Sequence, residues 1–233
     1  VRRCSRRVGK RITPAARPVD INRLLRREGL LEVFTQEGME YLDPWTSRAF
    51  AVADHQVAHV YVREPELLPA VGDLLGELPG VDLVLDDEGK RAAGLDHPRA
   101  GELVAVAEPD AWFTYYYWLD DERAPDFART VEIHRKPGYD PAELFLDPAD
   151  QRVKLRAGAA LARKKLGFRY TMNVIPLDPS CVRGTHGRLP DDPADGPVLL
   201  ASDAAAKRDR LEAVEVKGLL LELLGVTKPV AAG

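Results

Sequence analysis

The sequence is poor in cysteine and lacks any long apolar run. It contains two cysteines, Cys4 and Cys181, among 233 residues, which excludes a disulfide scaffold and the known cysteine-based zinc modules. Its apolar runs stay well short of the ~20 residues that a membrane-spanning helix needs. The basic N-terminal residues are not followed by the apolar segment of a secretory signal. These absences predict a protein of the reducing cytoplasm that has no membrane partner.

The chain also has no excess of one charge. It holds 33 Lys and Arg residues against 37 Asp and Glu residues, a formal net charge of −4. This balance gives no general electrostatic attraction to nucleic acid, so no nucleic-acid partner is expected. Hydrophobic residues make up 45% of the chain and charged residues 30%, which predicts a soluble globular core rather than disorder.

The first eleven residues, VRRCSRRVGKR, depart from this balance. They hold six basic residues, no acidic residue and no apolar periodicity, so we expect residues 1–11 to be a disordered or aberrant terminus. A basic arm for nucleic acid is one alternative. A start inside a longer or disrupted gene product is another. Residues 227–233 are expected to form a flexible tail.

Apolar periodicity predicts strands that alternate with helices. Helices are predicted from Ile21 to a stop at Gly29, from Pro65 to Pro79, and over 154–166 and 209–224, with a short helical turn at 141–145. Strands are predicted at 30–34, 49–54, 57–62, 81–85, 101–108 and 112–118, with a turn at 86–89. The pattern indicates an α/β fold with a mixed or mostly parallel sheet flanked by helices. Residues 12–226 would form this domain, with 45–120 as a candidate inserted subdomain.

The five histidines are the first candidates for chemistry. Asp54, His55 and His59 have a metal-like spacing, but they lie on a predicted hairpin. Residues four apart across a hairpin turn do not share a face as they would on a helix, so a metal site is not expected there. His97 lies in the loop GLDHPRAGE, which leads into a strand.

The stretch EIHRKPGYDP, residues 132–141, is a second-tier candidate for a site loop. It combines His134 and Asp140 with two cations and a glycine between apolar elements, which is typical of functional loops. The same composition also suits a turn stabilised by its own Asp and Gly. A third interpretation is an unrelated α/β enzyme that binds a phosphate or carboxylate at Arg135 or Lys136.

His186 is the strongest candidate for a metal ligand. It lies between Gly184 and Gly187 in RGTHGRLPDD, and glycines let the backbone bend sharply around an imidazole. An imidazole presented in this way suits Zn²⁺ coordination through one ring nitrogen. The chain contains no HExxH, GxSxG, P-loop or GxGxxG motif.

The order of several segments resembles the C-terminal half of alkaline phosphatase superfamily proteins, in the type I phosphodiesterase/nucleotide pyrophosphatase-like branch. The resemblance extends from Ile12 to about Val226 and depends on order and spacing. The segments that carry it are ITPAARPVDINRLLRREGLL, RAFAVADHQVAHVYV, DHPRAGELVAVAEPDAWFTYYYW, EIHRKPGYDP and GTHGRLPDDP.

The resemblance implies a hydrolase of phosphoric esters with a two-metal site. Two divalent ions, usually zinc, would activate a Thr or Ser nucleophile against a small phosphate-ester substrate. The Gly-x-His-Gly motif of the family places His186 as one metal ligand. The nucleophile and most other ligands of the family lie upstream, and the Asp-His pair expected just before Ile12 is replaced by VGKR.

These departures predict little or no activity from the chain alone and no catalytic residue within it. The alternative is a non-catalytic binding or assembly fragment that docks with a separately encoded N-terminal half. The residues specify neither the substrate nor the oligomeric state.

Overall fold

A computed structural model describes residues 7–8, 12–132, 134–148, 150–192 and 196–226. The chain divides into two compact units, one of Ile12–Leu189 and one that combines Val1–Arg11 with Pro190–Gly233. Within the described ranges, no helix is both long and apolar enough to cross a membrane. The tail predicted at 227–233 and most of the terminus predicted at 1–11 lie outside the described residues.

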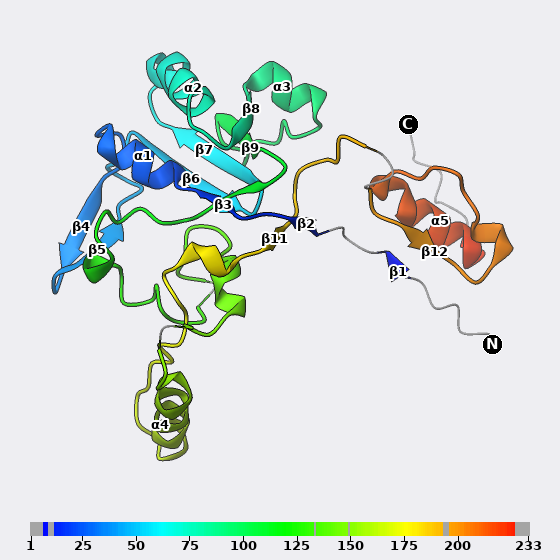
Figure 1. The fold of residues 1–233 in the computed structure, drawn as a ribbon. Helices are drawn as coiled ribbons and strands as arrows, with labels where there is room; N and C mark the ends of the chain where they lie inside the picture. Colours follow the sequence, from blue (N-terminus) through cyan, green and yellow to red (C-terminus); the bar gives the residue numbers. More distant parts are fainter. Residues whose placement is uncertain (1–6, 9–11, 133, 149, 193–195, 227–233) are drawn as a thin grey trace. The chain divides into compact units, whose positions relative to one another are not determined.

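A four-stranded antiparallel sheet forms the centre of the larger unit (Figure 1). Its order is β6-β7-β9-β8, and its strands are β6 Ala49–Asp54, β7 Val57–Val62, β9 Leu103–Ala107 and β8 Val81–Leu85. Buried and partly exposed residues alternate along β6 and β7, as the period of a strand requires. Four alanines of β6 and β7 are fully buried, which leaves room for a helix to approach the sheet closely: Ala49, Ala51, Ala53 and Ala58.

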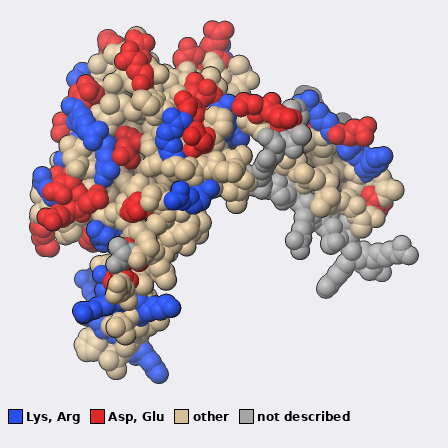
Figure 2. All heavy atoms as spheres, viewed as in Figure 1, with Lys and Arg blue, Asp and Glu red and all other residues tan. Residues whose placement is uncertain are grey.

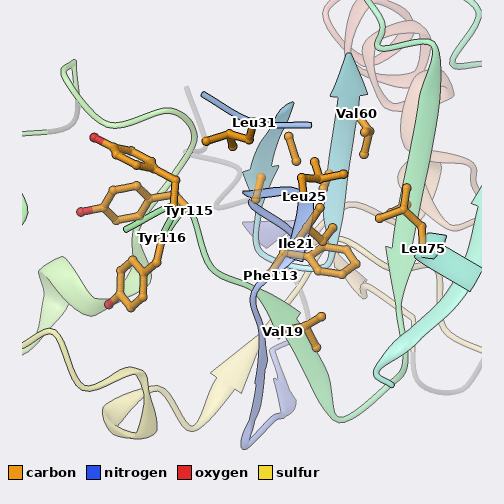
Figure 3. Packing of buried hydrophobic residues seen from close by; sticks show 14 of the residues in the cluster. Val19, Ile21, Leu25, Leu31, Val60, Leu75, Phe113, Tyr115 and Tyr116 are labelled. Atoms are coloured by element: carbon orange, nitrogen blue, oxygen red, sulfur yellow. The ribbon is translucent and has the colours of Figure 1, made fainter. Parts of the chain in front are cut away.

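Helix α1, Ile21–Arg27, packs on β6 through both apolar and polar contacts. The side chain of Asn22 accepts a hydrogen bond from the Ala51 amide at 2.7 Å and donates one to the Ala51 carbonyl at 2.9 Å. Ile21 and Leu25 lie in the main hydrophobic cluster with residues of β7 and of helix α2 (Figure 3). This arrangement fixes the helix on the edge strand of the sheet.

Helix α2 and helix α3 flank the other strands. Helix α2, Leu68–Gly76, follows a 3₁₀ turn at Pro65–Leu67 and contacts β8. Helix α3, Asp87–Ala92, begins where the sequence predicts only a turn. The Asp86 carboxylate accepts hydrogen bonds from the amides of Glu88 and Gly89 at 3.0 and 2.9 Å, so Asp86 caps a helix rather than closing a turn.

The predicted α/β fold with a mixed or mostly parallel sheet is confirmed only in part, because helices and strands are mixed as expected but the strand pairs are mostly antiparallel. Strands β6 and β7 are joined by a two-residue turn, which permits only antiparallel pairing. Among the described strands, the parallel pair is β3 Arg17–Val19 with β10 Ala111–Phe113. The remaining pairs of the larger unit are antiparallel: β4 Val33–Gln36 with β5 Met39–Leu42, and β2 Thr13–Pro14 with β11 Gly184–Thr185.

The aromatic run 112–118 is a strand only as far as Phe113. Its partner β3 ends at Val19 and is followed directly by α1, so no strand is available to pair with the later residues. They are buried nevertheless, each 1% exposed or less: Tyr115, Tyr116, Tyr117 and Trp118. Their rings meet in edge-to-face and tilted contacts, which aromatic pairs favour.

Four further helical segments lie in the described part of the larger unit. Helix α4, Val153–Lys165, ends before Gly167 as predicted, and Gly167 has a φ of +79°. Short 3₁₀ helices lie at Asp121–Arg123, Pro141–Leu144 and Pro179–Cys181. The one at Pro141–Leu144 confirms the predicted helical turn.

The described residues of the smaller unit include a strand pair and an α-helix. Strand β1, Arg7–Val8, pairs antiparallel with β12, Leu199–Leu200. Helix α5, Val216–Leu223, follows 3₁₀ turns at Ala204–Ala206 and Ala213–Glu215. The helix predicted over 209–224 therefore starts late. The reason is a capping box in which Glu212 and Glu215 satisfy each other's backbone amides and place the start of the helical segment there.

Candidate functional site

The turn between β6 and β7 holds a histidine in an uncommon conformation. His55 has a φ of +54°, a left-handed conformation that few residues other than glycine adopt. The surroundings fix it, because the His55 carbonyl accepts a hydrogen bond from the Phe113 amide at 2.7 Å. Gln56 adds a second anchor, since its carbonyl accepts from the Ala107 amide at 2.9 Å. The turn is therefore held by both β9 and β10.

The loop of His186 lies against this turn. Strand β11 ends at Thr185, and the carbonyl of His186 accepts a hydrogen bond from the Gln56 amide at 3.2 Å. Gly187 has a φ of +121°, and a Cβ there would lie 3.4 Å from the Gln56 nitrogen. At Gly184 a Cβ would lie 2.6 Å from Cγ2 of Ile12. Gly184 thus leaves room for the Ile12 side chain, and Gly187 allows a positive φ beside the Gln56 backbone.

The rings of His55 and His186 pack together. Their centroids lie 4.1 Å apart at an interplanar angle of 37°, and Tyr139 stacks on His55 at 5.1 Å and 28°. The hydroxyl of Thr185 lies 3.3 Å from Nδ1 of His55, and both residues are buried. His186 is partly exposed. We call His55, Tyr139, Thr185 and His186 the imidazole cluster.

The stretch 132–141 reaches this cluster through Tyr139. Gly138 forms a parallel bridge with Ala53, and a Cβ on Gly138 would overlap the Ala53 carbonyl oxygen. The Tyr139 amide donates to the same carbonyl at 2.8 Å. The stretch therefore docks on β6 directly before the turn, and a glycine is required at the point of contact.

His134 and Asp140, the second-tier candidates, have other surroundings. His134 is exposed, and its amide donates to the Glu132 carboxylate at 3.3 Å. Asp140 is buried and lies 3.1 Å from Nζ of Lys136, which also lies 2.6 Å from Glu143. Burial raises the pKa of the Asp140 carboxyl, and Lys136 opposes that rise. The Asp140 carboxylate also caps the following 3₁₀ turn, by accepting from the Ala142 amide at 3.0 Å.

Two other histidines are engaged by backbone amides. Nδ1 of His59 accepts from the Gly101 amide at 3.2 Å, and burial followed by the charge of Lys90 lowers the pKa of His59. Nδ1 of His97 accepts from the Arg99 amide at 3.1 Å. His55 packs on His186, whereas His59 binds the Gly101 amide. The spacing of Asp54, His55 and His59 is that of the β6–β7 hairpin.

The residues that the structure describes do not by themselves fit a two-metal centre. A zinc site needs about three protein ligands. The imidazole cluster supplies two imidazoles, and the described part of the chain contains no group of three His, Cys, Asp or Glu residues placed to hold an ion. His186 remains the predicted metal ligand, and His55 is the second histidine beside it among the described residues.

Sequence reasoning missed His55 as the neighbour of His186. It weighed His55 only against Asp54 and His59, which are close in sequence. A usable signal was present, because a two-residue hairpin turn favours Gly or Asn at positions of positive φ, and this turn has His55 instead. Tyr139 was also passed over, although it lies in the stretch that sequence reasoning selected.

The fold is that of an α/β protein in which a sheet edge and a glycine-flanked loop bring two histidines together. Residues 11–140 match the model of the type I phosphodiesterase/nucleotide pyrophosphatase family. This is more than half of the chain, so the chain belongs to that family. The match includes His55, Tyr139 and Asp140, whereas His186 lies beyond it.

Solved structures of phosphonoacetate hydrolase from Sinorhizobium meliloti are also similar to the chain. The complex with phosphonoformate is 18% identical with a TM-score of 0.34, and the match covers 52% of this chain and 29% of that one. The complex with phosphonoacetate is 18% identical with a TM-score of 0.32, and covers 47% and 27%. The chain thus spans less than a third of the length of these structures. No curated protein matches it.

Proposed function

We propose that the chain takes part in metal-dependent hydrolysis of phosphoric esters and that His186 is one of the metal ligands. The observation that carries this proposal is the contact between His55 and His186, with ring centroids 4.1 Å apart on two anchored backbone segments. Family membership supplies the reaction class. A small phosphate ester is the proposed substrate, and divalent ions, with zinc as the first candidate, are the proposed cofactors.

The chain's own residues would orient the ligand in this proposal. The hydrogen bond from the Gln56 amide to the His186 carbonyl fixes the position of the His186 backbone. The ring of His55 then limits the orientations that the His186 imidazole can adopt, as a supporting residue does at a metal site. The nucleophile and the remaining ligands would come from residues outside those that the structure describes.

A hydrolysis assay with a matched histidine control tests this proposal. The chain, its His186→Ala variant and its His97→Ala variant would be compared on bis-p-nitrophenyl phosphate with added Zn²⁺, together with calorimetric zinc binding. We expect little or no turnover from all three and weak zinc binding that His186→Ala reduces and His97→Ala does not. Zinc binding that is unchanged in His186→Ala would contradict the proposal. Turnover that His186→Ala abolishes would show a complete site within the chain.

A second candidate is a non-catalytic assembly module. The observation that favours it is the pair of imidazoles without a third ligand among the described residues. Such a module would complete a site by docking with a separately encoded N-terminal half of the same family. Hydrolysis that appears only when that half is added, and that requires His186, would support this candidate. Unchanged hydrolysis on mixing would contradict it.

A further inference from the structure

A cavity of about 710 Å³ lies beside helix α4, among residues that are not part of the imidazole cluster. One wall is a single face of α4, because Arg156, Ala160 and Arg163 are spaced four and three residues apart. The segment that follows α4 and a loop of the larger unit form the rest. The complete lining is Asp126, Arg135, Arg156, Ala159, Ala160, Arg163, Arg169, Tyr170 and Thr171.

This cavity is part of an anchored structure. Val153 at the start of α4 packs with Ala142, Val174 and Ile175 in a small hydrophobic cluster. The amide of Val174 donates to the Arg129 carbonyl at 2.9 Å. These contacts tie both ends of the α4 segment to the neighbouring loops, so the arginines project from a defined support.

The lining carries four arginines and one acid. Asp126 is bound by Arg135, with N···O distances of 2.8 and 3.2 Å, and Arg156 pairs with Asp150. Among the described residues, no ion pair involves Arg163 or Arg169. The cavity therefore has two guanidinium groups without a neutralising carboxylate, and Figure 2 shows Lys and Arg side chains gathered in the part of the view that α4 occupies.

The chemistry of these side chains suits oxyanions, and phosphate is one that arginine binds well. The planar guanidinium group matches two phosphate oxygens at once, which a compact ammonium group does not. Small side chains at Ala159 and Ala160 leave the space between the arginines open. The volume falls within the range of about 300–1,000 Å³ that small-ligand sites occupy. Tyr170, 41% exposed, is the one aromatic residue of the lining, and Nζ of Lys164 lies 5.6 Å from the centre of its ring.

We infer that this arginine cavity binds a small ligand that carries two or more linked phosphate groups. The cations of separate chain segments would each hold one phosphate group. The inference does not depend on the proposed hydrolase function, because the lining shares no residue with the imidazole cluster. Linked phosphates could come from inorganic polyphosphate or from a nucleotide, and the two sources differ in whether Tyr170 has a base to stack on.

Calorimetry with two probes, inorganic tripolyphosphate and ATP, tests the inference on the intact chain. We expect both to bind, and Arg163→Ala/Arg169→Ala to weaken the binding of each by about tenfold or more. The matched control is Arg27→Ala/Arg99→Ala, which removes two exposed arginines outside the cavity and should leave binding unchanged. Circular dichroism would confirm that both double variants are folded.

Further comparisons distinguish a nucleotide from inorganic polyphosphate, and specific binding from a general attraction of anions. If ATP binds more tightly than tripolyphosphate and Tyr170→Ala removes the difference, the ligand is a nucleotide. Equal binding of the two probes supports the inference with an inorganic source. The inference is overturned if neither probe binds, if the control variant loses as much affinity as the cavity variant, or if polyglutamate of similar charge binds as tightly as tripolyphosphate.

Discussion

The rings of His55 and His186 lie with their centroids 4.1 Å apart, one on a hairpin turn and the other on a glycine-flanked loop far along the chain. Backbone hydrogen bonds hold both residues in place. The backbone amide of Gln56 donates to the His186 carbonyl at 3.2 Å, and the backbone amide of Phe113 donates to the His55 carbonyl at 2.7 Å. The contact between the two imidazoles is therefore built into the backbone. On this contact we base the proposal that the His55 ring limits the orientation of the His186 imidazole.

Replacement of His55 by Asn should change the environment of the His186 ring and leave the hairpin turn intact. Asn tolerates positive φ better than most residues, so His55→Asn should keep the hairpin and remove the ring that packs on His186. We expect the ring signals of His186 in a ¹H–¹⁵N NMR spectrum to shift in His55→Asn and to stay in place in His97→Asn. An unchanged His186 in the His55 variant would contradict the orienting role.

A methyl group at Gly138 should destabilise the protein. The new Cβ would overlap the Ala53 carbonyl oxygen, and the φ of Gly138 is +111°. We expect Gly138→Ala to lower the free energy of unfolding in urea by about 1–3 kcal/mol, the usual cost of overpacking. Gly158→Ala is the matched control, because α4 has open space there and should gain stability from a better helix former. Equal stability of the two variants would show that Gly138 does not lie against β6.

Loss of the Asn22 side chain should loosen α1 from the sheet. Asn22→Ala removes both hydrogen bonds to the Ala51 backbone, at 2.7 and 2.9 Å, and leaves a buried amide and carbonyl without partners. Each such group costs about 1–3 kcal/mol, so the free energy of unfolding should fall by at least about 2 kcal/mol. Gln36→Ala, at an exposed position of β4, is the control. A change as small as that of the control would contradict the packing of α1 on β6.

Removal of Lys136 should destabilise the protein in a pH-dependent way. Lys136→Met leaves the buried Asp140 and Glu143 without their cation, a change that costs about 3–5 kcal/mol when a buried pair is broken. The pKa of Asp140 in the folded protein is already raised above its usual value by burial, and loss of Lys136 removes the group that opposes this rise.

The direction of the pH effect follows from proton binding. A carboxyl with a raised pKa holds its proton more tightly in the folded state, so stability falls as the pH rises from below its unfolded value through its folded value. The cost of Lys136→Met should therefore be smaller at acidic pH than at neutral pH in urea denaturation. Lys154→Met, at an exposed site on α4, should show no such trend. A cost that does not change with pH would contradict the buried ion cluster.

Local sequence patterns predicted the elements that depend on nearby residues. The alternation in AFAVAD and VAHVYV predicted β6 and β7 with their bounds, and Gly29 and Gly167 marked the ends of α1 and α4 because each takes a positive φ. The aromatic run was predicted as a strand from composition alone. It leaves the sheet after Phe113, since β3 ends and no partner is available.

The candidate site could be predicted only in part, because some of its contacts join segments that are distant in the sequence. The glycines around His186 are a local signal, and they indicated an imidazole held on a sharp bend. The contact with His55 depends on pairing of β11 with β2 and on the bond between Gln56 and His186, which join distant segments. Tyr139, and not His134, reaches the imidazole cluster because Gly138 pairs with Ala53 of β6. No pattern within residues 132–141 specifies that register.

A zinc titration followed on the histidine ring nitrogens by NMR tests the central claim most directly, which is that His186 is a metal ligand supported by His55. The signals of His186 should move at lower zinc concentrations than those of the exposed His97 and His134, and His55→Asn should remove this advantage. If His186 responds no earlier than His97 and His134, the claim that the imidazole cluster is part of a metal site is contradicted.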